Sequence, residues 1–166
     1  MVRRLVVVAA VSAAAFVAAG CSTGTSHSAS SRSTPATPLP ADPHTAAALL
    51  KIARVFNDDY SAGRYAPVYA RWDARSQAVI SKAGYINRHA ECPSAPGPAP
   101  RTESASPGPH GAWLVHYEIG GQQLTDYWFY LARRWEFDLV LSNPQSVKLY
   151  RMSPANYATA VGCAGE

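Results

Sequence analysis

The sequence predicts an α+β domain in which helices come first and a curved antiparallel sheet follows. Apolar residues recur at helical spacing between residues 42 and 92, and after Gly111 they alternate with polar residues as in half-buried strands. Two successive predicted hairpins also agree on which side chains share a face, which supports their register. Residues 42–166 are enough for one domain in which a helical layer and a sheet enclose a single core.

The helical part of the domain contains three predicted helices. Asp42 is a suitable N-cap, and apolar residues then follow at helical spacing. The first helix is predicted to end at Gly63, because a glycine commonly ends a helix. A second helix is expected from about Pro67, and Ser81 caps a short third helix through "KAGYINRHAEC". The proline-rich residues 93–111 are expected to form a loop with a short edge strand around "RTESAS".

The sheet is predicted as two consecutive hairpins. The strands "AWLVHYEI" and "QQLTDYWFYL" are separated by Gly120 and Gly121, which suit a two-residue turn. Ala132 and Arg133 form the second turn, and it leads into a strand "WEFDLVL". "VKLYRM" is expected to add one more strand, and "SPANYATAVGC" a last helical turn.

The two hairpins predict which residues lie opposite each other. Trp113 pairs with Trp128 and Val115 with Asp126 in the first hairpin, and Asp126 meets Leu139 in the second. One face then carries the large apolar residues Trp113, Val115, Tyr117, Ile119, Leu124, Trp128, Tyr130, Trp135, Phe137 and Leu139. The opposite face carries His116, Glu118, Thr125, Glu136 and Asp138. Asp126 is therefore a carboxylate on an aromatic face.

The order of these elements resembles a known fold. The stretch "ALLKIARVFNDDYSAGRYAPVYARW", the short helix ending at Cys92 and the "RRWEFDL" hairpin are similar to the NTF2-like (cystatin-like) cone, and more narrowly to small secreted lipoproteins of high-GC bacteria that carry it. The resemblance covers about residues 43–166 and implies N-terminal helices packed on a curved antiparallel sheet. That fold hosts isomerases, dehydratases, cyclases, ligand binders and interaction modules, so it does not by itself give a function.

The N-terminus has the layout of a signal peptide over residues 1–20. Arg3 and Arg4 precede an uncharged apolar run, and small residues stand directly before Cys21. The run of about 15 residues is shorter than the roughly 20 that span a bilayer, so an uncleaved anchor is the less favoured alternative. The Ser-, Thr-, Ala- and Pro-rich residues 21–41 are predicted to be a flexible tether.

A cysteine after small residues resembles the lipobox of bacterial lipoproteins. The resemblance implies cleavage before Cys21 and attachment of diacylglycerol and further acyl chains such as palmitate to that residue. Two or three chains anchor a protein stably, so the implied location is the extracytoplasmic face of the cell membrane. Ala18 stands where the lipobox prefers leucine.

Assigning Cys21 to the lipid leaves two of the three cysteines, Cys92 and Cys163. Export permits a disulfide between them, which would close a loop of about 70 residues and stabilise the domain by roughly 4 kcal/mol. Two buried free thiols are the alternative.

Composition argues against several functions. Without residues 1–20 the chain has 13 Lys and Arg against 11 Asp and Glu, so the formal net charge falls from +4 to +2. No basic patch interleaved with aromatic residues is present, and nucleic acid is not an expected partner. None of the five histidines forms a pair with the spacing of a helical zinc site, and no metal or cofactor is predicted.

Asp126 is the candidate catalytic residue. A carboxylate among aromatic rings is partly desolvated, so its pKa rises and it could act as a general base with Tyr117 or Tyr130 as hydrogen-bond donor. The alternative places Asp126 at the sheet rim, paired with an arginine or with tyrosine hydroxyls. The aromatic face is either a filled core or a ligand pocket, with Trp113, Tyr117, Trp128 and Tyr130 as its lining residues.

Three functional hypotheses follow. The leading one is a non-enzymatic, lipid-anchored envelope protein that binds a partner protein or a small apolar or aromatic ligand. The second is an isomerase- or dehydratase-type enzyme of small-molecule chemistry that uses Asp126. The third is an accessory domain for cell-wall assembly or transport.

Overall fold

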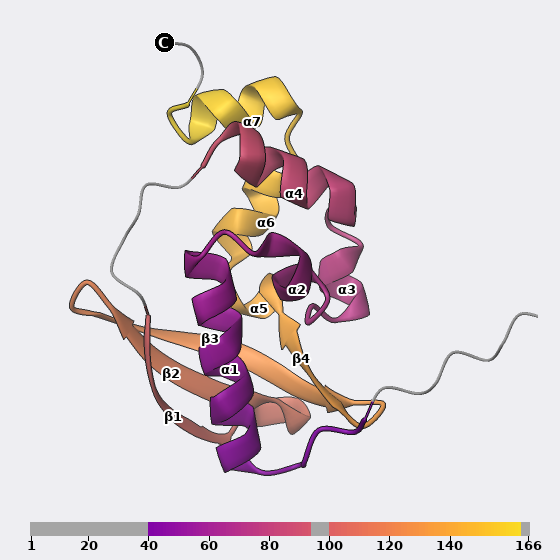
Figure 1. Ribbon diagram of the computed structural model, residues 1–166, viewed down its shortest axis with the longest axis vertical. Helices are drawn as coiled ribbons and strands as arrows, with labels where there is room; N and C mark the ends of the chain where they lie inside the picture. Colours follow the sequence, from indigo (N-terminus) through magenta and orange to yellow (C-terminus); the bar gives the residue numbers. More distant parts are fainter. Residues whose placement is uncertain (1–39, 94–99, 164–166) are drawn as a thin grey trace, which may run out of the picture. The chain divides into compact units, whose positions relative to one another are not determined.

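The computed structural model describes residues 40–93 and 100–163 of the 166-residue chain, all within a unit that spans residues 39–166. In this described part, four α-helices precede a four-stranded sheet and three follow it, which confirms the α+β class (Figure 1). The helices are α1 (Ala46–Ser61), α2 (Tyr65–Tyr69), α3 (Ala74–Gln77), α4 (Lys82–Glu91), α5 (Leu139–Ser142), α6 (Pro144–Tyr150) and α7 (Pro154–Ala160). The strands are β1 (Arg101–Pro107), β2 (Trp113–Ile119), β3 (Gln122–Leu131) and β4 (Arg134–Asp138).

Three regions predicted from the sequence lie outside the described residues. They are the signal peptide at residues 1–20, the lipidated Cys21 and the tether up to residue 39. None of the helices in residues 40–93 and 100–163 has both the length and the apolarity needed to cross a membrane.

The sheet is an antiparallel meander with the strand order β1-β2-β3-β4. Its register is the predicted one over most of its length: Trp113 lies opposite Trp128, and Val115 opposite Asp126. The short edge strand expected near residue 101 is present as β1, which pairs with β2. Because side chains alternate between the two faces of a strand, this register fixes which of them point toward the helices.

Both hairpins have two-residue turns, as predicted. Tight turns of this kind need a positive φ at both central residues. Gly120 and Gly121 adopt φ values of 58° and 81° without steric cost, whereas Ala132 and Arg133 adopt 44° and 65°. The second turn is therefore strained, because residues with a Cβ avoid this region.

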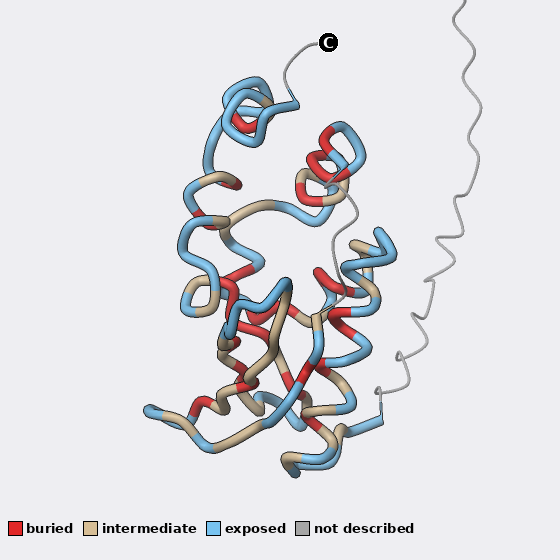
Figure 2. The backbone as a smooth tube through the Cα atoms, turned by 90° about the vertical axis from the view of Figure 1, so that its left-hand side faces the viewer, coloured by how far each residue is buried: buried red, intermediate tan, exposed pale blue. Residues whose placement is uncertain are grey.

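The inner face of the sheet, which carries Val115, Trp128 and Phe137, forms the core together with α1. Phe56 of α1 packs its ring 5.2 Å from that of Trp128 and 4.8 Å from that of Phe137, measured between centroids. Leu49 of the same helix is also fully buried. The buried segments of α1 and of the strands face one another across this layer (Figure 2).

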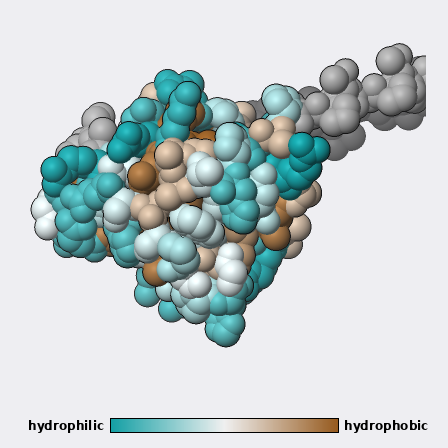
Figure 3. Space-filling view, turned by 90° about the horizontal axis from the view of Figure 1, so that it is seen from below, coloured by the Kyte–Doolittle hydropathy of each residue, from teal (hydrophilic) through white to brown (hydrophobic). Residues whose placement is uncertain are grey.

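The outer face of the sheet combines polar with half-buried apolar side chains. His116 and Thr125 form a cross-strand pair, with Nδ1 2.9 Å from Oγ1. Leu114, Tyr127 and Phe129 are half-buried on the same face. From below, hydrophobic and hydrophilic residues are interspersed over the molecule (Figure 3).

The start of α1 differs from the prediction. Thr45, and not Asp42, is the N-cap, and its hydroxyl accepts a hydrogen bond from the Ala48 amide at 3.2 Å. The Asp42 carboxylate instead accepts hydrogen bonds from Arg71 at 2.7 Å and from the Trp135 amide at 3.0 Å. Burial opposes ionisation of Asp42, but these hydrogen bonds outweigh it and hold its pKa below the usual value. Asp42 therefore joins the entering chain to β4.

The second predicted helix is divided into α2 and α3. Between them Trp72 forms an isolated parallel bridge with Phe137 of β4, where the Phe137 amide donates to the Arg71 carbonyl and the Asp73 amide donates to the Phe137 carbonyl. Pairing with the free edge of β4 thus competes successfully with a continuous helix. Ser81 caps α4 as predicted, with its hydroxyl accepting from the Gly84 amide.

The chain after β4 is helical, which corrects two predictions. The strand expected over "WEFDLVL" ends at Asp138, whose carboxylate caps α5 by accepting from the Leu141 amide at 2.9 Å. Leu139 consequently lies in α5 and does not pair with Asp126. The segment "VKLYRM", expected to be a strand, lies mostly in α6, which Asn143 caps. The last helical turn predicted near the C-terminus is present as α7.

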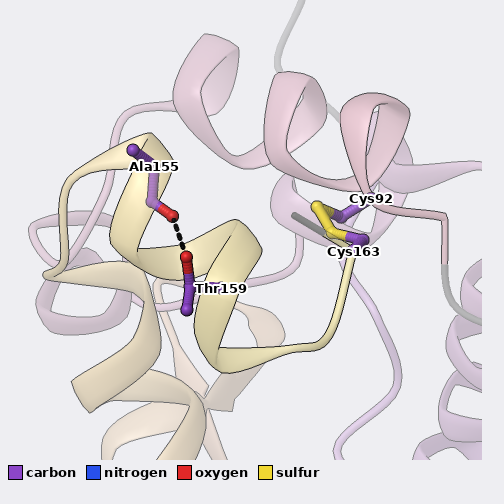
Figure 4. The surroundings of a disulfide bond; sticks show 4 residues. All are labelled: Cys92, Ala155, Thr159 and Cys163. Carbon is purple, nitrogen blue, oxygen red and sulfur yellow. Dashed lines mark hydrogen bonds between the residues drawn. A yellow bond between two sulfur atoms is a disulfide. The ribbon is translucent and has the colours of Figure 1, made fainter. Parts of the chain in front are cut away.

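A disulfide joins Cys92 to Cys163, as predicted, across a Cα–Cα distance of 5.8 Å (Figure 4). Cys92 directly follows α4, and Cys163 lies just beyond α7. Arg88 of α4 also donates to the Met152 carbonyl and lies 4.9 Å from the Tyr157 ring centroid. These contacts attach the C-terminal helix to the helical layer.

Candidate ligand cavity

A cavity of about 520 Å³ opens on the inner face of the sheet. Its walls come from α1, α2, α4, β2, β3, β4, the start of α5 and α6. Phe56, Trp72 and Phe137 contribute apolar wall, and Tyr60 and Leu124 lie at more exposed positions. The aromatic face is therefore partly a filled core and partly the wall of a hollow.

Five tyrosines line the cavity, and each comes from a different element. They are Tyr60 of α1, Tyr65 of α2, Tyr85 of α4, Tyr117 of β2 and Tyr150 of α6. The rings of Tyr65 and Tyr85 meet edge to face at 5.8 Å, and so do those of Tyr85 and Tyr150 at 5.6 Å. Such contacts fix the ring orientations, so this wall is largely preformed.

Asp126 lines the same cavity from β3. Its side chain points inward because it lies opposite Val115 in the register, and only 7% of the residue is exposed. Burial raises the pKa of the carboxyl to about 7, and a hydrogen bond with Tyr117 partly counteracts that rise. The pKa of Tyr117 is also raised, first by burial and then by the nearby carboxylate. Asp126 is thus a desolvated acid that titrates near neutral pH.

Asp126 gives the cavity wall a negative formal charge that no described lining residue balances. It is the one formally charged side chain among the described residues that line the cavity, which include no Lys, Arg or His. The expectation that an arginine pairs with Asp126 is therefore not met in this lining, whereas pairing with a tyrosine hydroxyl is met by Tyr117. A partner of opposite charge would have to come from outside these residues.

A neutral histidine supports the tyrosine wall from behind. His89 of α4 is 3% exposed, its ring is stacked on that of Tyr65 at 4.2 Å, and its Nε2 lies 3.0 Å from the Tyr150 hydroxyl. Burial lowers the pKa of His89 to about 4. His89 is therefore uncharged at neutral pH and holds two of the cavity tyrosines in position.

The four residues predicted to form the pocket occupy different places. Tyr117 lines the cavity, whereas Trp113, Trp128 and Tyr130 are not among its described lining residues. Trp128 is fully buried against Phe56. At the other end of the inner face, Trp113 packs on Trp135, and Tyr130 donates its hydroxyl to the Asp42 carbonyl at 2.6 Å. Tyr130 is therefore engaged away from Asp126.

Sequence reasoning did not identify four of the cavity tyrosines. Tyr60, Tyr65, Tyr85 and Tyr150 lie on helices or at their ends, and only their assembly in three dimensions brings them to Asp126. The available signal was the number of tyrosines in the helical half, since a tyrosine needs a partner for its hydroxyl when buried.

Metal-ligating side chains would be another possible basis for a site. Residues 40–93 and 100–163 contain no group of three or more His, Cys, Asp or Glu side chains that could hold an ion.

No protein-family model, curated protein or solved structure matches this chain. The function of the domain is therefore inferred from the cavity itself.

Proposed function

We propose that this protein binds a small, largely apolar molecule in the cavity on the inner face of the sheet. The observation that carries the proposal is a hollow of about 520 Å³ with a buried carboxylate in its wall. Small-molecule sites are commonly clefts of roughly 300–1,000 Å³ with apolar walls and a few polar groups that fix orientation. The aromatic wall around Asp126 has this composition.

The carboxylate itself argues for binding over simple packing. An isolated buried acid costs stability, and an apolar residue at position 126 would serve a filled core better. Groups with strongly perturbed pKa values in a cleft are candidate functional groups because function offers a reason to keep them there. Asp126 meets both conditions, since it is buried and its pKa is raised to about 7.

We also propose that the protein is attached to the outer face of the cell membrane through acylated Cys21. The support is the signal-peptide layout of residues 1–20 and the disulfide between Cys92 and Cys163, which suits an oxidising compartment. Changing Cys21 to alanine should move the protein from the membrane fraction to the soluble fraction.

The arrangement of helices on a curved sheet around a cavity also supports assignment of the fold to the NTF2-like cone.

Binding can be tested with the neutral fluorescent probe N-phenyl-1-naphthylamine and the full-length protein. We expect saturable fluorescence enhancement above the detergent blank. Ser61 lines the cavity from an exposed position at the end of α1, so Ser61→Trp should weaken binding at least tenfold by obstructing it. Arg54→Trp is the matched control, because Arg54 is exposed on the same helix and does not line the cavity.

Two outcomes of this experiment would contradict the proposal. One is the absence of saturable binding to the wild-type protein. The other is equal affinity of the wild-type protein and the Ser61→Trp variant, which would place the probe elsewhere on the surface.

An enzymatic role is the second candidate function. It is favoured by the pKa of about 7 at Asp126, because a general base works best when its pKa lies near the operating pH. Tyr117 would be the hydrogen-bond donor, since Tyr130 donates to Asp42 instead. Proton exchange next to the carbonyl of cyclic ketones, followed by NMR in deuterated water, should then be lost in Asp126→Asn. Exchange that persists in that variant would exclude Asp126 as the base.

A further inference from the structure

We propose that the ligand of this cavity is an organic ammonium ion, an amine-bearing molecule with an apolar body, and that the Asp126 carboxylate is its counter-charge. This inference rests on the proposed binding function and adds the chemical class of the ligand.

The charge distribution of the lining is the first argument. Asp126 is the one formal charge among the described lining residues, and the titratable groups around it are tyrosines. An anionic ligand would be placed beside a carboxylate with no cation to offset the repulsion, or would have to keep Asp126 protonated. A neutral ligand would leave an ionised Asp126 uncompensated. A cation supplies the missing partner, because opposite charges attract strongly in a poorly solvated site.

The aromatic wall is the second argument. Tyrosine rings attract cations through the negative potential of their faces, and desolvated contacts of this kind contribute more than exposed ones. Tyrosines reach the cavity from α1, α2, α4, β2 and α6, so a cation inside it is surrounded by rings from several directions. Phe56 and Phe137 add apolar surface for the body of the ligand.

Preorganisation is the third argument. Asp126 is desolvated by the fold itself, and it shares a hydrogen bond with Tyr117. The cost of removing water from the carboxylate is therefore incurred on folding and not on binding, which favours affinity. The desolvation that remains to be overcome is that of the ammonium group.

The charge class of the ligand can be tested with three compounds that share one body. These are 4-phenylbutylamine, 4-phenylbutan-1-ol and 4-phenylbutyrate, titrated calorimetrically into the full-length protein at pH 8. We expect the amine to bind at least tenfold more tightly than the alcohol, and the carboxylate to show no saturable binding. Asp126→Asn should reduce the affinity for the amine to that for the alcohol and leave the alcohol within threefold of its wild-type value.

The pH dependence gives an independent readout. Asp126 is mostly ionised at pH 8 and mostly protonated at pH 6, because its pKa is about 7. Affinity for the amine should therefore fall about tenfold from pH 8 to pH 6, while affinity for the alcohol stays constant. Burial keeps the pKa values of Tyr85, Tyr117 and Tyr150 raised, so these groups do not titrate over this range. Asp58→Asn, the same chemical change at an exposed position of α1, should behave like the wild-type protein.

The outcomes separate this inference from the proposed function. If the alcohol binds as tightly as the amine, the site takes neutral ligands, so the ammonium inference is wrong while cavity binding stands. Binding of the neutral naphthylamine probe without any preference for the amine leads to the same conclusion. If neither the probe nor any of the three compounds binds, the cavity is not a ligand site and both proposals fail.

Discussion

Replacing Asp126 by asparagine should stabilise the folded protein by about 4 kcal/mol at pH 8 and leave its stability nearly unchanged at pH 4. The unfolded chain ionises this residue near pH 3.8, whereas the folded protein keeps it protonated up to about pH 7. Between these values the folded state binds more protons, so the contribution of Asp126 to stability falls as the pH rises. The difference between a pKa of 3.8 and one of about 7 corresponds to about 4 kcal/mol.

Urea unfolding of the wild-type protein and of Asp126→Asn across pH 4–8 measures this effect as a difference between the two proteins. The comparison is needed because His89 contributes a pH dependence of stability with the opposite sign. In the unfolded chain His89 becomes protonated below its ordinary pKa of 6.5, whereas in the folded protein it becomes protonated only near pH 4. The contribution of His89 to stability therefore falls as the pH drops. It is common to both proteins and cancels.

Asp58→Asn is the control for the chemical change itself and should show no pH-dependent gain, because Asp58 is exposed. A loss of stability in Asp126→Asn at pH 8 would show that the ionised carboxylate is compensated in the folded state. That result would remove the argument that Asp126 is held in the cavity at a cost to the fold.

Removing the disulfide should lower the free energy of unfolding by about 4 kcal/mol. The bond connects residues separated by 71 positions, and cross-linking a loop of that length restricts the unfolded chain strongly. Alanine is the suitable replacement, because Cys92 is buried and a serine hydroxyl there would need a partner. The measurement is urea unfolding of the wild-type protein and of the variant that carries both Cys92→Ala and Cys163→Ala.

A reducing agent provides the matched condition. It should destabilise the wild-type protein to the level of the double variant and leave the double variant unchanged. If reduction has no effect on the wild-type unfolding curve, the two cysteines do not carry the link between α4 and α7. The contacts of Arg88 with Met152 and Tyr157 would then be sufficient to hold the C-terminal helix.

The sheet could be predicted from the sequence because its constraints agree with one another. Two turns of two residues fix the register of three strands, and the alternating pattern allows one choice of face. The inward position of Asp126 follows directly, as does the pairing of Trp113 with Trp128. The disulfide followed once Cys21 was assigned to the lipid, and its two cysteines lie in the described part of the chain.

The helical elements after Asp138 were harder to predict because a short apolar segment fits both helix and strand. Asn143 and Pro144 suit the end of a strand, but they suit equally the N-cap and first position of a helix, which they occupy in α6. The cavity was beyond local reasoning for a different reason. Its tyrosines come from five elements, and nothing within one element indicates that they meet.

The strained turn at Ala132 and Arg133 also marks where the chain enters the domain. The Asp42 amide donates to the Arg133 carbonyl at 3.0 Å, so the start of the domain is fixed at the end of β3 that leads into β4. Leu124 lies toward the opposite end of that strand, near the turn that joins β2 to β3, and Asp126 lies midway along it. β3 has 10 residues, which corresponds to about 30 Å. The two ends of β3 therefore serve different purposes: one holds the start of the described chain at Asp42, and the other carries Leu124, an exposed residue of the cavity wall.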